Sequence, residues 1–139
     1  METDCDQKLI IAYYQTSYRV PELDLTFRLG RKNSRLERWC EENQIQSWAF
    51  ITAWNPQSEK INKTENKVRN SALKKLLEEG DFRYWKGLGV PDKSEDWDSE
   101  QSFWVVNIDL QEAVDLGNLF HQRALVYGRV GIRPSLIWL

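Results

Sequence analysis

The stretch Trp48-Ala-Phe-Ile-Thr-Ala-Trp-Asn-Pro56 decides the fold of this 139-residue chain. Apolar residues run through it almost without polar alternation, which predicts a strand over 47–54 that is buried on both faces. Proline cannot donate a ladder hydrogen bond, and it restricts the residue before it to extended backbone. We therefore expect the strand to end at Asn55-Pro56.

Strands and helices follow one another irregularly on both sides of this stretch. Before it, the sequence predicts strands over 8–15 and 23–29 and a helix over 34–43. After it, the predicted elements are a helix over 62–79, strands over 82–85 and 102–108, a helix over 110–121, and strands over 123–130 and 134–139. Residues 86–101 have no period and are expected to form a loop. The order ββαβαββαββ predicts an α+β fold in which about three helices cover a mixed or mostly antiparallel sheet.

Length and composition fit one ordinary globular domain. The 139 residues suffice for a single core, and 41% of them are hydrophobic. We expect one domain over 1–139, with residues 1–7 as a flexible tail. The formal net charge of −2 gives no whole-molecule attraction to nucleic acid or to an anionic membrane.

The two cysteines, Cys5 and Cys40, show neither the spacing of a metal site nor a disulfide framework. The N-terminus is acidic and carries no signal-peptide pattern, and the longest apolar run is far shorter than a membrane span. These features predict a cytoplasmic protein with two free thiols and no membrane contact. Cys40 falls on the apolar side of the helix 34–43, where an inert core thiol is expected.

The predicted helix 62–79 turns from apolar to polar along the face that is expected to be buried. At 100° per residue, the apolar part of this stripe consists of Val68, Ala72, Leu73 and Leu76. Its polar part, one or two turns earlier, consists of Asn62, Glu65 and Arg69, with Asn66 at its border. Either the helix start overhangs a wet cleft, or Glu65 and Arg69, spaced i,i+4, form a buried ion pair. Asn62 and Glu65 also fit the N-cap and N3 positions of a capping box.

A polar cleft at the end of the 47–54 strand is the resulting hypothesis. The N-terminus of the helix 62–79 would favour an anion there, with the 86–101 loop as a lid. The candidate catalytic residues are Glu65 and Glu100, one or the other as the proton acceptor, and the candidate ligand-binding residues are Asn55, Asn66, Arg69 and Gln122. Arg69 or the helix start would hold the anionic group. A small anionic ligand, phosphate-bearing or nucleotide-like, fits this set best. The sequence identifies no cofactor.

Motifs for other kinds of chemistry are missing from the sequence. The single histidine, His121, falls on the apolar side of the helix 110–121, where a core or helix-end role is expected. With one histidine and no cysteine cluster, we predict no metal site of the zinc type, while carboxylate-bound Mg²⁺ stays open. There is no phosphate-cradling glycine motif and no nucleophile elbow.

Two alternatives involve binding without chemistry. The stretch 28–38 gathers the basic residues Arg28, Arg31, Lys32, Arg35 and Arg38. It is either a solvated face or the surface of a regulatory module that contacts nucleic acid or protein. The C-terminal segment Leu136-Ile-Trp-Leu139 would, as an exposed edge strand, allow a homodimer to form.

Five short pieces of the sequence, taken in order, identify a family. They are Tyr14-Gln-Thr-Ser-Tyr18, Ile51-Thr-Ala-Trp-Asn-Pro56, Glu65-Asn66, Glu100-Gln-Ser-Phe103 and Phe120-His-Gln-Arg-Ala124. Together they resemble a bacterial domain of unknown function, family number 3293, over about residues 10–139. Gln101 stands where this family usually has a second acid, which argues against a two-carboxylate role. The resemblance implies a small bacterial domain and supports the chosen site positions, but it implies no reaction.

Overall fold

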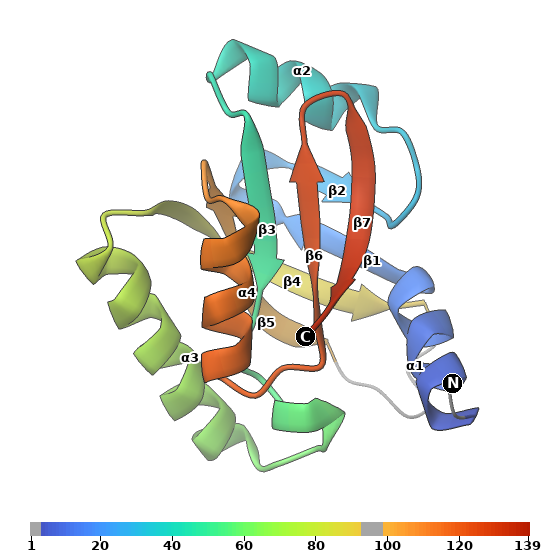
Figure 1. Cartoon of the computed structure of the whole chain (residues 1–139), viewed down its shortest axis with the longest axis vertical. Coiled ribbons are helices and arrows are strands. Elements are labelled where there is room, and N and C mark those ends of the chain that lie inside the picture. Colours follow the sequence, from blue (N-terminus) through green and yellow to red (C-terminus); the bar gives the residue numbers. More distant parts are fainter. Residues whose placement is uncertain (1–3, 93–98) are drawn as a thin grey trace.

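The computed structural model describes residues 4–92 and 99–139, with side chains from Asp6 onward, and in these ranges seven strands form one antiparallel sheet (Figure 1). The strand order is β2-β1-β4-β5-β3-β6-β7. The strands are β1 (Thr16–Val20), β2 (Leu25–Phe27), β3 (Ser47–Ile51), β4 (Arg83–Pro91), β5 (Glu100–Val106), β6 (Ala124–Arg129) and β7 (Ile132–Trp138). The helices are α1 (Asp4–Tyr14), α2 (Ser34–Glu42), α3 (Lys63–Glu79) and α4 (Leu110–Leu119), with short 3-10 turns η1 (Pro21–Leu23) and η2 (Pro56–Ser58).

The predicted α+β class is confirmed, and so is the order ββαβαββαββ from β1 to β7. The sheet is antiparallel throughout the described residues, and β3 lies inside it between β5 and β6, as expected for a strand buried on both faces. One helix more than expected, α1, precedes this order.

The predicted strand over 8–15 is wrong, because these residues belong mostly to α1 and the first strand begins at Thr16. Leu9 is buried and Tyr13, four residues later, is half-buried, whereas Ile11 is 54% exposed. That spacing is helical, but a short apolar run does not by itself separate a helix from a strand. Residues 4–7, expected in a flexible tail, form the start of the same helix.

The loop predicted over 86–101 is shorter than expected. Residues 86–91 continue β4, and β5 begins at Glu100, while residues 93–98 lie outside the described residues. Gly87 and Gly89 gave this part of β4 the composition of a loop. In the sheet, Gly87 lies against the Phe50 ring, so that an added Cβ atom would be 2.6 Å from that ring. Glycine there provides room for a core side chain and does not mark a turn.

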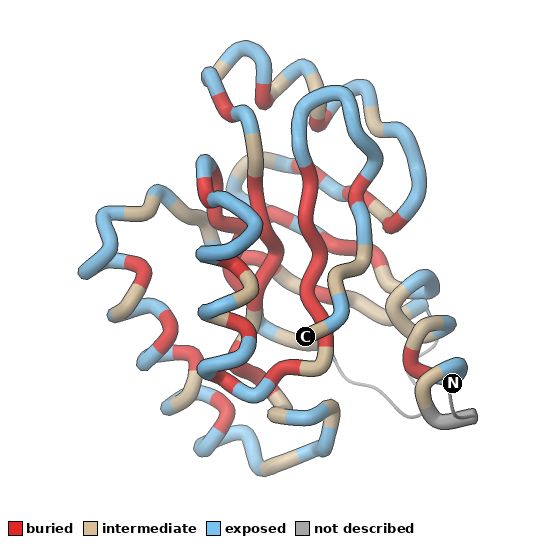
Figure 2. The backbone as a smooth tube through the Cα atoms, viewed as in Figure 1, coloured by how far each residue is buried: buried red, intermediate tan, exposed pale blue. Residues whose placement is uncertain are grey.

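The sheet is curled, and its central strands are the most deeply buried part of the fold (Figure 2). One hydrophobic cluster lies on the concave face of the sheet and a second on the convex face. Alternate residues of β3 point to opposite faces, so that Trp48 and Phe50 lie in the concave cluster and Ala49 and Ile51 in the convex one. Helix α2 contributes Leu36 and Cys40 to the concave cluster; α1 contributes Tyr13. Helices α3 and α4 cover the convex face instead.

The two edges of the sheet are β2 and β7. The chain that leaves β2 reaches the other edge, because the Gly30 backbone N donates to the Pro134 O atom at 2.9 Å. Gly30 has a φ of +70°, which glycine adopts without strain. The position of β7 agrees with the dimer hypothesis, but pairing through Leu136–Leu139 stays a prediction.

Candidate functional site

The site is built on the segment Ala53–Asn55, which begins two residues after the end of β3 at Ile51. Its backbone groups are held by side chains of neighbouring elements. Both backbone groups of Ala53 are bonded by α3: Asn70 Oδ1 accepts from its N at 2.9 Å, and Arg69 Nε donates to its O at 2.8 Å. Gln122 Nε2 donates to Trp54 O at 3.2 Å. Asn66 Oδ1 accepts from Asn55 N at 2.7 Å. Thr52 Oγ1 accepts from Trp54 N at 3.0 Å. Such complete bonding fixes a stretch of chain that is neither helix nor strand.

The buried stripe of α3 differs from the predicted one. It consists of Asn66, Asn70, Leu73 and Leu77, whereas Val68 is 66% exposed and Ala72 is exposed as well. The predicted change from apolar to polar toward the N-terminus is present, but it occurs on a neighbouring face of the helix. The polar part is buried because Asn66 and Asn70 bond the 53–55 backbone.

Glu65 and Arg69 do not form the ion pair that their spacing allows. Glu65 is exposed and completes the N-cap of α3, where Asn62 Oδ1 accepts from Glu65 N and Asn62 Nδ2 donates to Glu65 Oε1, each at 2.8 Å. Arg69 donates to the carbonyls of Ala53 and Phe120, so that it links the 53–55 segment to the end of α4. In the described part of the chain, no ion pair joins the two side chains.

Asn55 has a left-handed backbone, with φ +48°, where extended backbone was expected before Pro56. Gln57 and Ser58 also have positive φ values, at +56° and +59°. Backbone in this region is strained for residues other than glycine and persists only where its surroundings fix it. Here Asn55 Oδ1 accepts from Asn66 Nδ2 at 2.8 Å and from Ile61 N at 3.2 Å. Its own Nδ2 atom is thereby turned toward Glu100 Oε1, at 3.4 Å.

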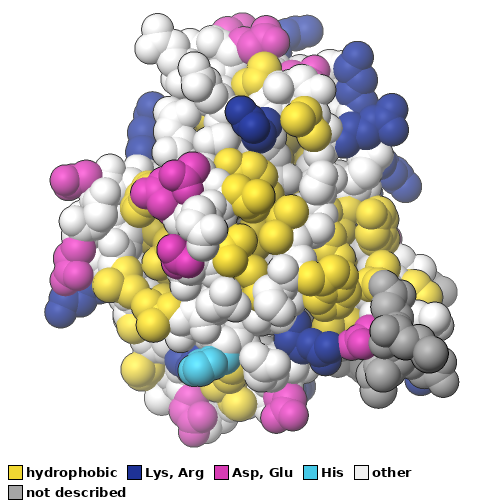
Figure 3. Space-filling view, in the orientation of Figure 1, with side chains coloured by type: hydrophobic (Ala, Val, Ile, Leu, Met, Phe, Trp, Pro, Cys, Tyr) yellow, Lys and Arg dark blue, Asp and Glu magenta, His cyan; other side chains and the backbone are white. Residues whose placement is uncertain are grey.

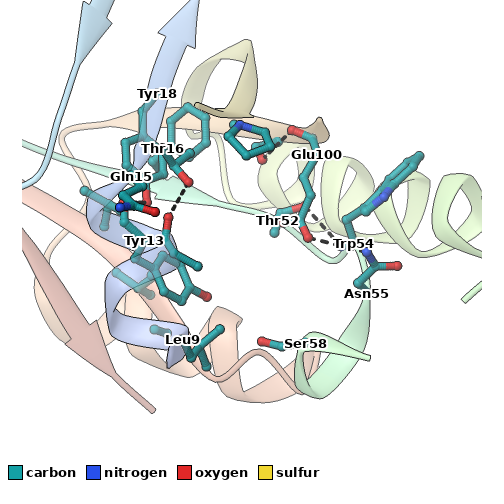
Figure 4. A pocket seen from close by; sticks show the side chains of 18 of the residues that line it. Leu9, Tyr13, Gln15, Thr16, Tyr18, Thr52, Trp54, Asn55, Ser58 and Glu100 are labelled. Carbon is teal, nitrogen blue, oxygen red and sulfur yellow. Dashed lines mark hydrogen bonds between the residues drawn. The ribbon is translucent and has the colours of Figure 1, made fainter. Parts of the chain in front are cut away.

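A cavity of about 320 Å³ lies between this segment and α1, at one end of the concave face (Figure 4). We call it the Glu100 cavity. Figure 4 shows Leu9, Tyr13, Thr16 and Tyr18 of α1 and β1 on one side and Thr52, Asn55 and Ser58 on the other, with Glu100 above the latter. Phe50, Gly89, Ser102, Gln122, Ala124 and Val126 also line it.

The Glu100 carboxyl has an unusual environment. Burial raises its pKa from an ordinary 4.5 to about 7, and the hydrogen bond from Asn55 opposes this change. The pKa of Tyr13 and that of Tyr18 are also raised, first by burial and then by neighbouring negative charge that includes Glu100. The cavity therefore holds a carboxyl that changes charge near neutral pH beside two phenols that stay neutral.

The predicted site residues separate into three groups. Asn55, Glu100 and Gln122 line the Glu100 cavity. Asn66 and Arg69 lie behind it and hold the 53–55 backbone, while Glu65 is exposed at the start of α3.

The side chains from α1 and β1 that line the cavity were missed because 8–15 was assigned to a strand. The period-two pattern of β3 would have placed Thr52 on the face of Trp48 and Phe50.

The α3 N-terminus, expected to attract an anion, borders a different hollow. That hollow, of about 580 Å³, lies beyond the 54–58 segment and is lined by Lys60, Lys63, Asn66 and Gln101, among others. The predicted cation Arg69 lines neither this hollow nor the Glu100 cavity. The parts of the predicted anion site are therefore not gathered around Glu100.

Neither a metal cluster nor a membrane span is found in the part of the chain that the structure describes. No group there brings together three or more His, Cys, Asp or Glu side chains, and no helix there is long and apolar enough to cross a membrane. His121 is exposed just beyond α4, so it has the helix-end role. Cys40 is a buried free thiol, and burial raises its pKa to about 11. The cytoplasmic location, bacterial origin and single-domain organisation stay predictions.

The basic stretch 28–38 is partly neutralised. Arg28 forms two bonds to the Asp92 carboxylate, at 2.6 and 2.9 Å, and Arg35 pairs with Asp24 at 3.1 Å. Arg31, Lys32 and Arg38 are exposed. Lys and Arg side chains gather in this region at the upper right of Figure 3. Lys32 shares a shallow depression with Arg129, Arg133 and Glu37.

Comparison with known proteins gives one result. The profile of a family described as protein of unknown function (DUF3293) matches residues 51–125. This range holds the 53–55 segment, α3 and Glu100, and ends inside β6. No match was found among curated proteins or among solved structures.

Proposed function

We propose that this chain, which belongs to the DUF3293 family, binds a small organic molecule in the Glu100 cavity. The volume of about 320 Å³ falls at the lower end of the range for ligand pockets. Such pockets combine mostly apolar walls with a few convergent polar groups. The observation that carries the proposal is the Glu100 carboxyl facing the Asn55 amide inside this cavity.

The rigidity of the site supports the proposal. Asn55 has a strained backbone, and Asn66, Arg69 and Asn70 of α3 bond the segment on which it lies. Strain at a position fixed by its surroundings is typical of functional sites. A polar group that is already oriented does not lose freedom when a ligand binds, so less affinity is lost.

The chemistry of the cavity favours a ligand with a hydrogen-bond donor over the anion expected from the sequence. The sequence assigned that anion to Arg69 or to the α3 N-terminus. The Arg69 guanidinium is bonded to two backbone carbonyls, and the α3 N-terminus borders a different hollow. The charged residues lining the cavity in the described ranges are Lys8, Asp92 and Glu100, and the first two are exposed. If the bound molecule is converted, Glu100 is the proposed proton acceptor, since a pKa near 7 suits a general base at neutral pH.

Gly89 offers a direct test, because it is buried in β4 and lines the cavity. A Cβ atom added there would have its nearest neighbours at 3.8 and 3.9 Å, which is ordinary contact, so a larger side chain would occupy the cavity. We expect fragments that bind the wild-type protein to lose affinity progressively in Gly89→Ala, Gly89→Val and Gly89→Ile. Binding would be followed by chemical-shift changes of Tyr13, Ser58 and Glu100, with thermal melting as the check on folding.

Equal affinity of such fragments for wild type and Gly89→Ile would contradict the proposal. A fragment screen that moves no resonance of these three residues would contradict it as well. In either case the cavity would be a packing feature of the curled sheet.

A second candidate is contact with nucleic acid through the 28–38 stretch, favoured by the convergence of Lys32 with Arg129 and Arg133. Charges from distant parts of the chain would add to one phosphate-binding surface. We expect binding to weaken steeply with salt and to drop in Lys32→Ala and Arg133→Ala, with Lys74→Ala on α3 as the control. Absence of a gel shift at low salt excludes this candidate.

A further inference from the structure

We propose that the ligand of the Glu100 cavity is an organic amine that binds as a cation and carries a short apolar body. This inference rests on the proposed function above, and it names the class of molecule that the cavity accepts. Its basis is the Glu100 carboxyl, which has no cationic partner in the described ranges and shares the cavity with aromatic and aliphatic side chains.

Of the described charged residues that line the cavity, only Glu100 is not exposed to solvent, and it is an acid. Among the described residues, no ion pair involves Glu100, and its hydrogen-bond partner Asn55 is neutral. Lys8 is exposed, and the exposed Asp92 is already bonded by Arg28. A carboxylate that is largely withdrawn from water is costly when it has no counter-charge, and the described residues provide none for Glu100. A ligand with a positive charge would provide it.

The walls suit a cation with an apolar body. Tyr13, Tyr18 and Phe50 line the cavity, and the faces of aromatic rings attract ammonium groups. The Tyr18 hydroxyl already donates to the Tyr13 carbonyl at 3.0 Å, so it does not compete for the carboxylate. Leu9, Ala12 and Val126 provide aliphatic surface for the remainder of the ligand.

The volume of about 320 Å³ is at the lower end of the range for ligand pockets, which favours a small molecule. A single aromatic or aliphatic ring with a one- or two-carbon amine arm is of that kind. Benzylamine is therefore a suitable probe, with benzyl alcohol and benzoate as neutral and anionic molecules of nearly the same shape.

The test compares these three probes by calorimetry and by chemical-shift mapping at pH 8, where Glu100 is ionised. We expect benzylamine to bind at least about tenfold more tightly than benzyl alcohol, as is typical of a hydrogen bond to a charged group, and benzoate to bind most weakly. In Glu100→Gln, the advantage of benzylamine over benzyl alcohol should disappear while benzyl alcohol still binds. Glu42→Gln, an exposed glutamate on α2, is the matched control and should keep the advantage.

The outcomes separate this inference from the proposed function. If benzyl alcohol or benzoate binds the cavity as tightly as benzylamine, the inference is overturned and the proposed function stands. An advantage for benzylamine that persists in Glu100→Gln overturns it too, because the carboxyl would then not select the cation. If neither these probes nor any screened fragment perturbs the cavity, the proposed function fails together with the inference.

Discussion

Asn66 and Asn55 hold each other by two hydrogen bonds. Asn66 Oδ1 accepts from the Asn55 backbone N at 2.7 Å, and Asn66 Nδ2 donates to Asn55 Oδ1 at 2.8 Å. A carboxamide is needed for this arrangement, because it presents an acceptor and a donor side by side. Asn66 is only 2% exposed, so water has little access to replace either bond.

Replacing Asn66 by leucine, which has a similar size, should therefore destabilise the protein by about 3 kcal/mol, because the Asn55 N–H would be left unpaired in the interior. Urea unfolding measures the change. The control is Asn118→Leu on the exposed side of α4, which should stay within about 0.5 kcal/mol of wild type. Equal stability of Asn66→Leu and wild type would show that the 53–55 segment does not depend on this pair.

Arg69→Met tests whether this arginine holds backbone or binds an anion. Because the guanidinium donates to the Ala53 and Phe120 carbonyls, we expect a loss of about 2 kcal/mol in the free energy of unfolding. Lys67→Met, two residues earlier and exposed, should change the stability little. Full stability of Arg69→Met combined with loss of phosphate binding would instead restore the role predicted from the sequence.

Glu100 should make stability depend on pH in the direction opposite to most carboxylates. Its pKa is raised from 4.5 to about 7 on folding, so the folded state retains a proton that the unfolded state releases within this window. Stability from this group is fully present below pH 4.5 and is lost as the pH rises through 7. The free energy of unfolding that this pKa shift contributes is at most about 3 kcal/mol.

Glu100→Gln should consequently gain stability relative to wild type between pH 4.5 and 8, by up to about 3 kcal/mol. Urea unfolding at half-unit pH steps measures the difference between the two proteins, with Glu42→Gln as the reference for an exposed carboxyl. A difference that does not change with pH would mean that the Glu100 carboxyl is well solvated.

Gly128→Ala should be strongly destabilising although it adds a single methyl group. An added Cβ atom would lie 2.2 Å from the Trp48 ring, which is itself buried in the concave cluster. Overpacking of this kind costs about 1–3 kcal/mol. Gly89→Ala, with 3.8 Å to its nearest neighbour, is the matched control and should leave the melting temperature near that of wild type. Similar melting of the two variants would show that Trp48 can move aside.

Local patterns were sufficient for much of the fold. The apolar run around Trp48 predicted β3, and this strand is present. Helix α2 and strand β2 also lie within the ranges that were predicted for them. Helix α1 was missed because its apolar residues have two periodic interpretations. The length of β4 was missed because Gly87 is required by the Phe50 ring, a contact between distant residues.

The site was harder to predict, for a reason that α3 illustrates. Hydrophobicity placed Val68 on the buried face, whereas Asn66 and Asn70 are buried because they bond a stretch of backbone. The number and spacing of polar residues in a sequence do not show which of them will bond a backbone group of another segment. The Glu100 cavity further depends on α1, some ninety positions away in sequence, meeting the start of β5.

The hydrogen bond from Gly30 to Pro134 has a consequence for aggregation. An exposed sheet edge can act as a template on which further chains add indefinitely. Here the carbonyl of Pro134 already has a partner within the same molecule, and proline contributes no N–H group at that position. Open-ended growth from β7 is thereby interrupted near the middle of the strand, so a Gly30 variant that loses this contact should form fibrils more readily than wild type.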